Sequence, residues 1–315
     1  MQWICGSLLT LSFAFFSAEL GANGISRGSN FEVHGHRGAR AREPENTLPA
    51  FAHALRGGAN VLELDLGVSS DGHLVLNHDF EVNTSFCRPT NARLMRRTFP
   101  LVHSLTLAQL KTYNCGATFV EAFPKRQLYP NAQIQIVSFD EFLTWLNGVD
   151  RAVGLNIETK IEAASPEKTL SPRAFVDLIV KSLRRNRIAP ERVILQSFDF
   201  RTIVYAKERY PEYRTSALFE GKTLDVASVR AETCVDRHRP ETCANYLSPD
   251  AGLLDRAKVR EAHELGMKVV PWTLNKSWHW SHFIQMGVDG IITDDPAALV
   301  KHLRSKTRNN GISRP

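Results

Sequence analysis

Residues 61–66 read Val61-Leu62-Glu63-Leu64-Asp65-Leu66, so that apolar and acidic side chains alternate. This alternation is typical of a β-strand, in which successive side chains point to opposite faces. The leucines are expected to pack against helices, which leaves Glu63 and Asp65 together on the other face. Two buried carboxylates repel each other and are costly to bury. A divalent cation would offset that cost because hard cations prefer oxygen ligands, and the stretch therefore predicts a buried strand beside a metal site.

Similar β-type runs alternate with helical patterns along the rest of the chain. The expected strands are residues 31–35, 61–66, 154–158, 193–196, 215–219, 245–247, 268–272 and 290–292. The expected helices are residues 48–56, 139–146, 172–187, 201–210, 255–265, 281–286 and 296–304. Strands that alternate with helices in one long domain predict an α/β fold, a closed (β/α)8 TIM barrel. A doubly wound open sheet is the alternative.

Two stretches interrupt this alternation. Residues 80–137 have no clean period, and residues 220–244 are similarly irregular. Both are interpreted as insertions on barrel loops, the first of them after the second strand, because loops of this length are usually functional or pinned excursions. The barrel domain is expected to span residues 25–304, followed by a polar tail at residues 305–315.

The N-terminus carries an apolar stretch, residues 4–16, followed by small residues. It is too short to cross a bilayer, which takes roughly 20 apolar residues. It therefore predicts a signal peptide over residues 1–24, although no Lys or Arg precedes it. This expectation places the protein in the periplasm or outside the cell.

The cysteine content agrees with export. Cys5 lies in the expected signal peptide, and four cysteines remain, an even number that favours disulfides in an exported chain. Proximity in sequence favours Cys87–Cys115 and Cys234–Cys243, one of the three connectivities that four cysteines allow.

The charge of the chain gives no evidence for a nucleic-acid partner. Lys and Arg number 39 against 33 Asp and Glu, a formal net charge of +6, but the basic residues are scattered among acids. No nucleic-acid recognition motif or basic stripe is present. We expect a small-molecule partner and no stable membrane insertion, and the sequence does not indicate an oligomeric state.

Chemically active residues gather at the expected ends of the first three strands. His34-Gly35-His36-Arg37-Gly38 ends the first strand, and barrel active sites lie at this end of the strands. His36 is therefore expected at the barrel mouth, whereas His34 lies deeper and is interpreted either as barrel packing or as a residue that supports the site residues. Asn77-His78-Asp79 follows the turn Asp71-Gly72, which would fold His78 back toward the carboxylates. Glu158 and Lys160 share a face at the end of the third strand.

Together these clusters indicate phosphodiester cleavage. The two histidines suit general acid and general base roles, because imidazole titrates near neutral pH. Three carboxylates with a metal suit charge neutralisation at a phosphoryl group, and Arg37 and Lys160 suit its oxygens.

The same residues resemble the glycerophosphodiester phosphodiesterase family, within the phospholipase C-like phosphodiesterase superfamily. The resemblance covers residues 31–304. It is carried by His36-Arg37-Gly38, Pro44-Glu45-Asn46-Thr47, Glu63-x-Asp65, Asp71-Gly72, His78-Asp79, Glu158-Thr159-Lys160, Gln196-Ser197-Phe198-Asp199, Pro271-Trp272-Thr273-Leu274-Asn275 and Thr293-Asp294-Asp295-Pro296.

The resemblance implies a role for each residue of the site. Glu63, Asp65 and Glu158 would bind a divalent cation, Ca2+ or Mg2+. His36 and His78 would be the acid and base, and Arg37 and Lys160 would hold the phosphate. Glu45 would position the site or help to hold the metal, and Trp272 would line the pocket for the alcohol. Phe198 would do likewise, although a core position accounts for it equally well.

The implied reaction yields glycerol 3-phosphate and an alcohol such as choline or ethanolamine. One alternative is a lysophospholipase D or phospholipase D-like lipid phosphodiesterase on the same barrel, which would need an apolar rim. The other is a binding protein without catalysis, which would be expected to have lost acid, base or metal residues.

Overall fold

The computed structural model describes residues 31–90, 99–149 and 151–310 of the 315-residue chain. The expected signal peptide, residues 1–24, and the end of the expected tail, residues 311–315, lie outside the described residues.

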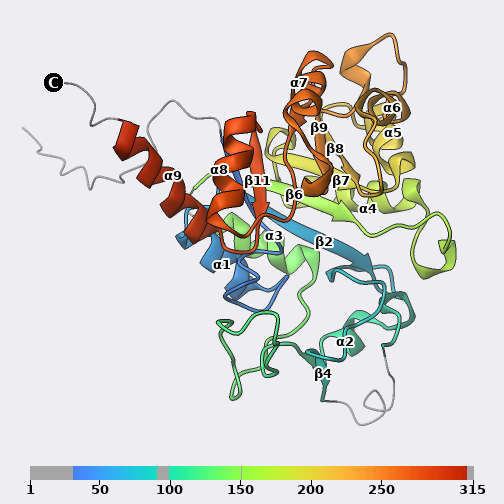
Figure 1. The fold of residues 1–315 in the computed structure, drawn as a ribbon. Coiled ribbons are helices and arrows are strands. Elements are labelled where there is room, and N and C mark those ends of the chain that lie inside the picture. The colour runs from blue at the N-terminus through green and yellow to red at the C-terminus, as the bar shows by residue number, and fades with distance from the viewer. Residues whose placement is uncertain (1–30, 91–98, 150, 311–315) are drawn as a thin grey trace, which may run out of the picture. The chain divides into compact units, whose positions relative to one another are not determined.

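Parallel strands form the predicted barrel (Figure 1). They are β1 (Glu32–Gly35), β2 (Val61–Val68), β6 (Gly154–Thr159), β7 (Val193–Ser197), β8 (Arg214–Phe219), β9 (Tyr246–Pro249), β10 (Lys268–Val269) and β11 (Gly290–Thr293). Their order is β10-β9-β8-β7-β6-β2-β1-β11. Backbone hydrogen bonds from Asp289 N to Val269 O (2.9 Å) and from Ile292 N to Pro271 O (3.0 Å) join the two ends of this order. The (β/α)8 barrel is confirmed, and the open-sheet alternative is wrong.

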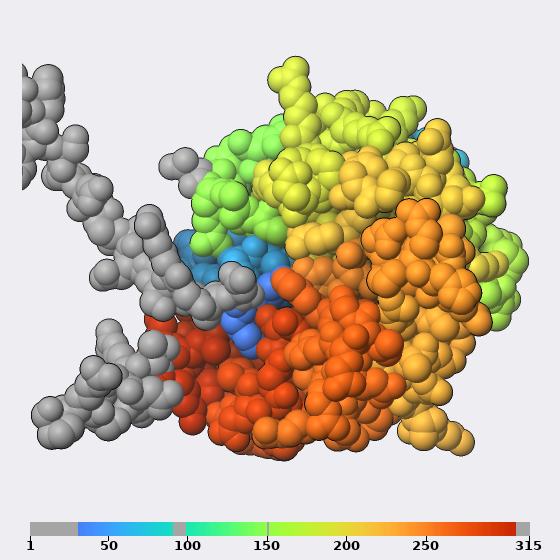
Figure 2. All heavy atoms as spheres, turned by 90° about the horizontal axis from the view of Figure 1, so that it is seen from above, coloured from blue at the N-terminus to red at the C-terminus, as the bar shows by residue number. Residues whose placement is uncertain are grey.

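Helices follow the strands and cover the outside of the barrel. They are α1 (Leu48–Arg56), α3 (Phe139–Asn147), α4 (Pro172–Arg185), α5 (Phe200–Arg209), α6 (Val226–Glu232), α7 (Arg256–Glu264), α8 (Ser277–Met286) and α9 (Pro296–Asn310). Short 3-10 helices lie at Val102–Ser104, Pro166–Lys168, Pro190–Arg192, Pro240–Thr242 and Ala251–Leu253. Figure 2 shows the green, yellow, orange and red segments following one another around the described domain.

Several helices begin at side chains that accept a backbone N–H, as capping predicts. Ser138 and Glu141 form a capping box at the start of α3, and Ser171 caps α4.

The core lies between the strands and the helices. Leu62, Leu64 and Leu66 of β2 are fully buried in an apolar cluster that includes Phe51 of α1 and Phe142 of α3. The opposite face of β2 therefore points into the barrel, as the alternation in its sequence predicts.

The insertion after the second strand is a compact unit. It follows β3 (Leu74–Leu76), which pairs antiparallel with β2. It contains α2 (Leu107–Leu110) and the antiparallel pair β4 (Arg88–Pro89) and β5 (Tyr113–Asn114). The predicted disulfide Cys87–Cys115 joins the strands of this pair near a small apolar cluster of the insertion.

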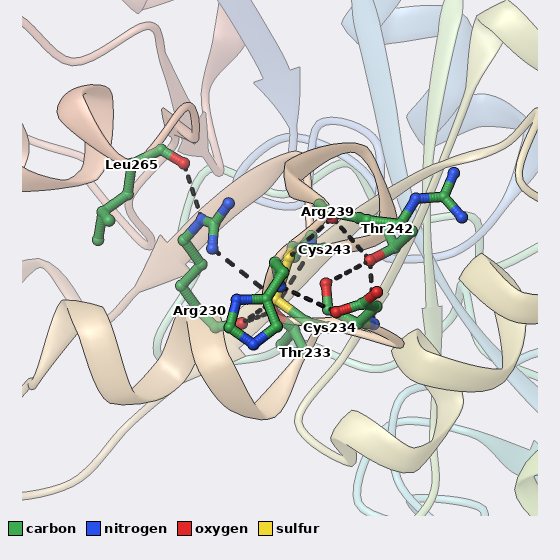
Figure 3. The surroundings of a disulfide bond; sticks show 10 residues. Arg230, Thr233, Cys234, Arg239, Thr242, Cys243 and Leu265 are labelled. Atoms are coloured by element: carbon green, nitrogen blue, oxygen red, sulfur yellow. Dashed lines mark hydrogen bonds between the residues drawn. A yellow bond between two sulfur atoms is a disulfide. The ribbon is translucent and has the colours of Figure 1, made fainter.

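The second expected insertion needs a correction, because residues 220–244 contain a helix of the barrel, α6. Asp225 caps α6 by accepting from Ser228 N, and Val226 and Val229 are buried. Two buried apolar residues in so short a helix give too weak a period to recognise. The true excursion is the loop after α6, closed by the predicted disulfide Cys234–Cys243 (Figure 3).

The C-terminal helix is longer than expected. Residues 305–310, expected in the polar tail, continue α9. The sequence did not predict this extension because these residues are polar and show no apolar periodicity. In the part of the chain that the structure describes, no helix has the length and apolar character needed to cross a bilayer.

Candidate active site

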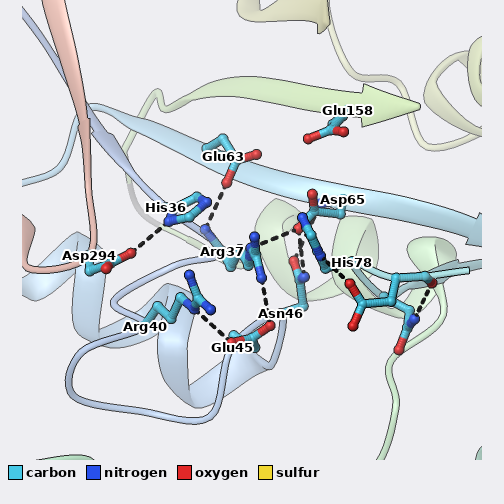
Figure 4. A network of polar contacts seen from close by, with 12 residues as sticks. His36, Arg37, Arg40, Glu45, Asn46, Glu63, Asp65, His78, Glu158 and Asp294 are labelled. Atoms are coloured by element: carbon cyan, nitrogen blue, oxygen red, sulfur yellow. Dashed lines mark hydrogen bonds and ion pairs between the residues drawn. The ribbon is translucent and has the colours of Figure 1, made fainter. Parts of the chain in front are cut away.

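Three buried carboxylates meet at the C-terminal ends of β2 and β6 (Figure 4). Glu63 and Asp65 come from β2, and Glu158 comes from the neighbouring β6. Their candidate ligand oxygens all lie within 4.8 Å of one another. This spacing suits oxygens that share one cation, since each Ca2+–O distance is about 2.3–2.6 Å. We call these three residues the carboxylate trio.

Glu63 is held from two sides. Its Oε2 accepts from the backbone N–H of Arg37 (2.8 Å), and its Oε1 accepts from Gln196 Nε2 (2.9 Å). Gln196 is oriented in turn by Asn156 Nδ2 (2.8 Å). Burial, with repulsion from Asp65 and Glu158, raises the pKa of Glu63 well above its usual range.

Asp65 lies beside the positive charges of the site. Its Oδ2 accepts from Asn46 Nδ2 (2.9 Å) and lies 3.4 Å from Arg37 Nε. Although burial opposes ionisation, the charges of His78, Arg37 and Lys160 lower the pKa of Asp65. Its Oδ1 is buried and has no hydrogen-bond partner among the described residues. A buried carboxylate oxygen without a hydrogen-bond partner, next to two other carboxylates, fits the ligand set of a divalent cation.

Lys160 directly follows β6 and faces the trio. Its Nζ lies 2.6 Å from Glu158 Oε1 and 3.7 Å from Asp65 Oδ1. Burial and the charge of Asp65 raise the pKa of Glu158, and the Lys160 ammonium only partly opposes them. Lys160 and Arg37 supply two positive charges against the three carboxylates, which leaves the trio negative when all are ionised.

His36 is held against a carboxylate from the far end of the chain. Its Nδ1 lies 2.6 Å from Asp294 Oδ1, and Asn275 Nδ2 donates to Asp294 Oδ2 (2.7 Å). This arrangement fixes the ring and leaves Nε2 for the cavity. Burial and the neighbouring Arg37 lower the pKa of His36, and Asp294 opposes that shift. The lowered pKa favours the neutral imidazole of His36.

His78 lies on the other side of Arg37 from His36 (Figure 4). It follows β3, and its Nδ1 lies 2.6 Å from Asp79 Oδ1. Its side chain is 32% exposed and lines the same cavity as His36, Glu63 and Glu158. The structure thus brings both predicted histidines to the carboxylate trio.

Glu45 binds arginines and is not a member of the carboxylate trio. It accepts from Arg37 Nη1 (2.8 Å) and Arg40 Nε (2.7 Å), and Arg126 of the insertion lies 3.5 Å away. Despite burial, these guanidinium groups lower the pKa of Glu45 to about 2. Glu45 therefore orients Arg37, which matches the positioning role among its two predicted roles.

A cavity of about 530 Å³ opens above the trio. The cations Arg37 and Lys160 and the aromatic residues Phe198 and Trp272 are among the residues that line it. The two aromatic rings meet edge to face with centroids 5.7 Å apart. Because Phe198 is 38% exposed, it is a cavity residue and not a core residue.

Sequence reasoning missed partners that hold the predicted residues in place. Asp294 and Asn275 orient His36, Gln196 holds Glu63, and Asn46 holds Asp65. All four residues lie in motifs that carried the family resemblance. Those motifs do not indicate which residue contacts which. His34 lies deep in the barrel as expected, where its Nε2 is 3.0 Å from Glu32 Oε2.

Comparison with known proteins agrees with this geometry. The model of the glycerophosphoryl diester phosphodiesterase family matches residues 36–298. The chain belongs to this family. The predicted family and enzyme class are therefore confirmed.

Relatives of the chain carry names from the same family. A protein of Mycobacterium tuberculosis named probable glycerophosphodiester phosphodiesterase 1 is 32% identical over 93% of this chain and 99% of its own length. A glycerophosphodiester phosphodiesterase of Caldanaerobacter subterraneus is 28% identical over 86% of this chain and 97% of its own. A crystal structure from Silicibacter pomeroyi, also named for this activity, superposes with a TM-score of 0.77 at 26% identity, covering 89% of this chain and 95% of that one.

Proposed function

We propose that the chain hydrolyses glycerophosphodiesters to glycerol 3-phosphate and an alcohol, in a reaction that depends on Ca2+ or Mg2+. One observation carries this proposal: a buried carboxylate trio with an orphaned oxygen lies beside two cations and two histidines in one cavity. The names of the relatives support the choice of substrate.

Glu63, Asp65 and Glu158 would hold the cation. When bound, it would neutralise charge on the phosphoryl group. Arg37 and Lys160 would bind the phosphate oxygens, because both are buried cations at the edge of the trio. Glu45 and Arg40 would keep the Arg37 guanidinium in place, which limits its loss of side-chain entropy when substrate binds.

We assign the general base role to His36. Asp294 holds its Nδ1, the lowered pKa favours the neutral ring, and Nε2 would take a proton from the attacking hydroxyl. That hydroxyl would belong either to water or to the glycerol part of the substrate, which would first form a cyclic phosphate. His78, oriented by Asp79 on the other side of Arg37, would protonate the leaving alcohol. The two disulfides support a periplasmic or secreted location.

The experiment is hydrolysis of glycerophosphocholine, glycerophosphoethanolamine and glycerophosphoglycerol, with enzymatic detection of glycerol 3-phosphate. EDTA should abolish turnover, and Ca2+ or Mg2+ should restore it. Lysophosphatidylcholine serves as the comparison substrate and should react much more slowly. Faster cleavage of lysophosphatidylcholine would favour the lipid phosphodiesterase instead. Turnover that EDTA does not lower would contradict the dependence on a divalent cation. A folded protein that cleaves none of these substrates would be the binding protein without catalysis.

A further inference from the structure

The active-site cavity continues into a second cavity away from the carboxylate trio. The second cavity has a volume of about 570 Å³. Both are lined by Ile161, Glu162, Phe198, Leu218 and Glu220. A phosphate bound beside the trio would therefore leave space beyond it for a whole substituent, and these shared residues would surround that substituent.

The two ends of this continuous space differ in charge. The end beside the trio carries the cations Arg37, Arg40 and Lys160. The shared region carries Glu162 and Glu220 instead. Neither of these carboxylates has an ion pair or a side-chain hydrogen bond within residues 31–90, 99–149 and 151–310. Their charges are therefore not neutralised by any described neighbour.

Other charged groups around the second cavity are already engaged. Arg201 donates from Nε to Asp199 Oδ1 (2.9 Å), and Glu232 accepts from Ser228 Oγ (3.2 Å). Among the described residues, Glu162 and Glu220 are therefore the charged groups of the shared region without an ion pair or a side-chain hydrogen bond.

Aromatic and apolar side chains complete the wall. Phe198 and Trp272 meet edge to face, with the Trp272 indole fixed by its Nε1 donating to Ser248 O (2.9 Å). Leu218 is buried at 3% exposure. A ring face attracts an ammonium or quaternary ammonium group, and nearby carboxylates add to that attraction. The side chains of Phe198 and Leu218 carry no hydrogen-bond donor, and the indole N–H of Trp272 is already used by Ser248 O.

We propose that Glu162, Glu220, Phe198 and Trp272 form a subsite that selects a leaving alcohol with a positive charge. The substrate class would be zwitterionic diesters, whose phosphate lies against the cations and whose ammonium lies against the carboxylates and rings. This inference rests on the proposed function and adds a charge preference to it.

The test compares kcat/KM for glycerophosphocholine with kcat/KM for glycerophosphoglycerol, whose leaving alcohol is neutral. The wild-type ratio should exceed one, and the E162Q/E220Q double variant should lower it roughly tenfold, as expected for the loss of two exposed ionic contacts. Higher salt should also lower the wild-type ratio, because exposed charges are screened. The matched control is Glu208→Gln, an exposed glutamate outside both cavities, which should leave the ratio unchanged.

The outcomes separate the subsite from the reaction. Hydrolysis of both diesters with a ratio near one, or a ratio that E162Q/E220Q does not change, overturns the subsite and leaves the proposed function standing. Failure to hydrolyse any glycerophosphodiester overturns the proposed function and the subsite with it. Both glutamates are exposed, and thermal unfolding of the double variant at the wild-type temperature would show that it folds.

Discussion

Two polar networks share the interior of one barrel, and they differ in whether their charges are balanced. At the N-terminal ends of the strands, Glu32 is bound by His34 Nε2 (3.0 Å), Lys268 Nζ (2.9 Å) and Tyr246 OH (3.0 Å). We call this network the floor. At the C-terminal ends, the carboxylate trio keeps an excess of negative charge and an orphaned oxygen on Asp65.

The pKa shifts express the same contrast. Burial alone would raise the pKa of Glu32, but His34 and Lys268 lower it to about 2. In the trio, burial and mutual repulsion raise the pKa values of Glu63 and Glu158. Each network includes a glutamate and lies beside a histidine, so residue type alone does not distinguish structure from chemistry. The floor is complete without a ligand, and the trio is not.

The largest expected difference is in catalysis. His36→Ala or His78→Ala should lower kcat by about 10²–10⁴-fold, the usual contribution of a positioned acid or base. His73→Ala, at an exposed histidine just before β3, is the control and should keep wild-type turnover. Steady-state kinetics with glycerophosphocholine make the comparison. Near-wild-type kcat in folded His36→Ala protein would contradict the assignment.

Asp294→Asn tests whether the partner of His36 tunes its pKa. Asp294 opposes the lowering of the His36 pKa, so its removal should lower that pKa further. The acid limb of the kcat/KM profile should then move to lower pH, because a base works in its neutral form. We also expect kcat to fall, by up to about 10⁴-fold if the ring is no longer held. If the acid limb stays in place or moves to higher pH, Asp294 does not raise the pKa of the general base.

At the floor, Glu32→Gln should change stability instead of chemistry. The folded pKa of Glu32 is below its unfolded value of 4.5, so the carboxylate stabilises the fold fully above pH 4.5 and loses this effect as pH falls toward 2. Urea unfolding should show a loss of about 3 kcal/mol at pH 7 that shrinks by pH 3. An equal loss at both pH values would mean that the charge is not responsible.

The smallest expected effect is a gain in the free energy of unfolding, and it comes from a substitution in the carboxylate trio. The pKa of Glu158 is raised, so its charge destabilises the metal-free fold at pH 7. Glu158→Gln keeps an acceptor for Lys160 and should raise the free energy of unfolding in EDTA. Thermal unfolding in EDTA would measure the difference in stability between this variant and wild type. A variant less stable than wild type would show that the trio is balanced without a cation.

Much of this fold follows from local pattern. The alternation in β2 placed the leucines and carboxylates on their correct faces, and α1 begins and ends at the predicted residues. Short elements were less predictable. The helix α6 has only two buried residues, and β10 ends at Val269 where residues 268–272 were expected as strand, since Pro271 has no N–H to donate.

The candidate site was predictable only as far as strand ends determine it. Glu63 and Asp65 lie in β2, Glu158 lies in the neighbouring β6 and His36 follows β1, so their meeting follows from the parallel sheet. The contact of His36 with Asp294 spans 258 residues and exists because β1 pairs with β11 when the barrel closes. Likewise, Arg126 reaches Glu45 from an insertion without a regular period. Such contacts depend on tertiary closure, which no local pattern encodes.

The central difference between the two networks can be measured directly by calorimetric titration of Ca2+ and Mg2+ into metal-stripped protein. Wild-type protein and Glu32→Gln should each bind one divalent cation per chain with similar affinity, and Glu158→Gln should bind it far more weakly or not at all. Equal binding by wild type and Glu158→Gln, or no binding by wild type, would contradict a divalent cation held by Glu63, Asp65 and Glu158.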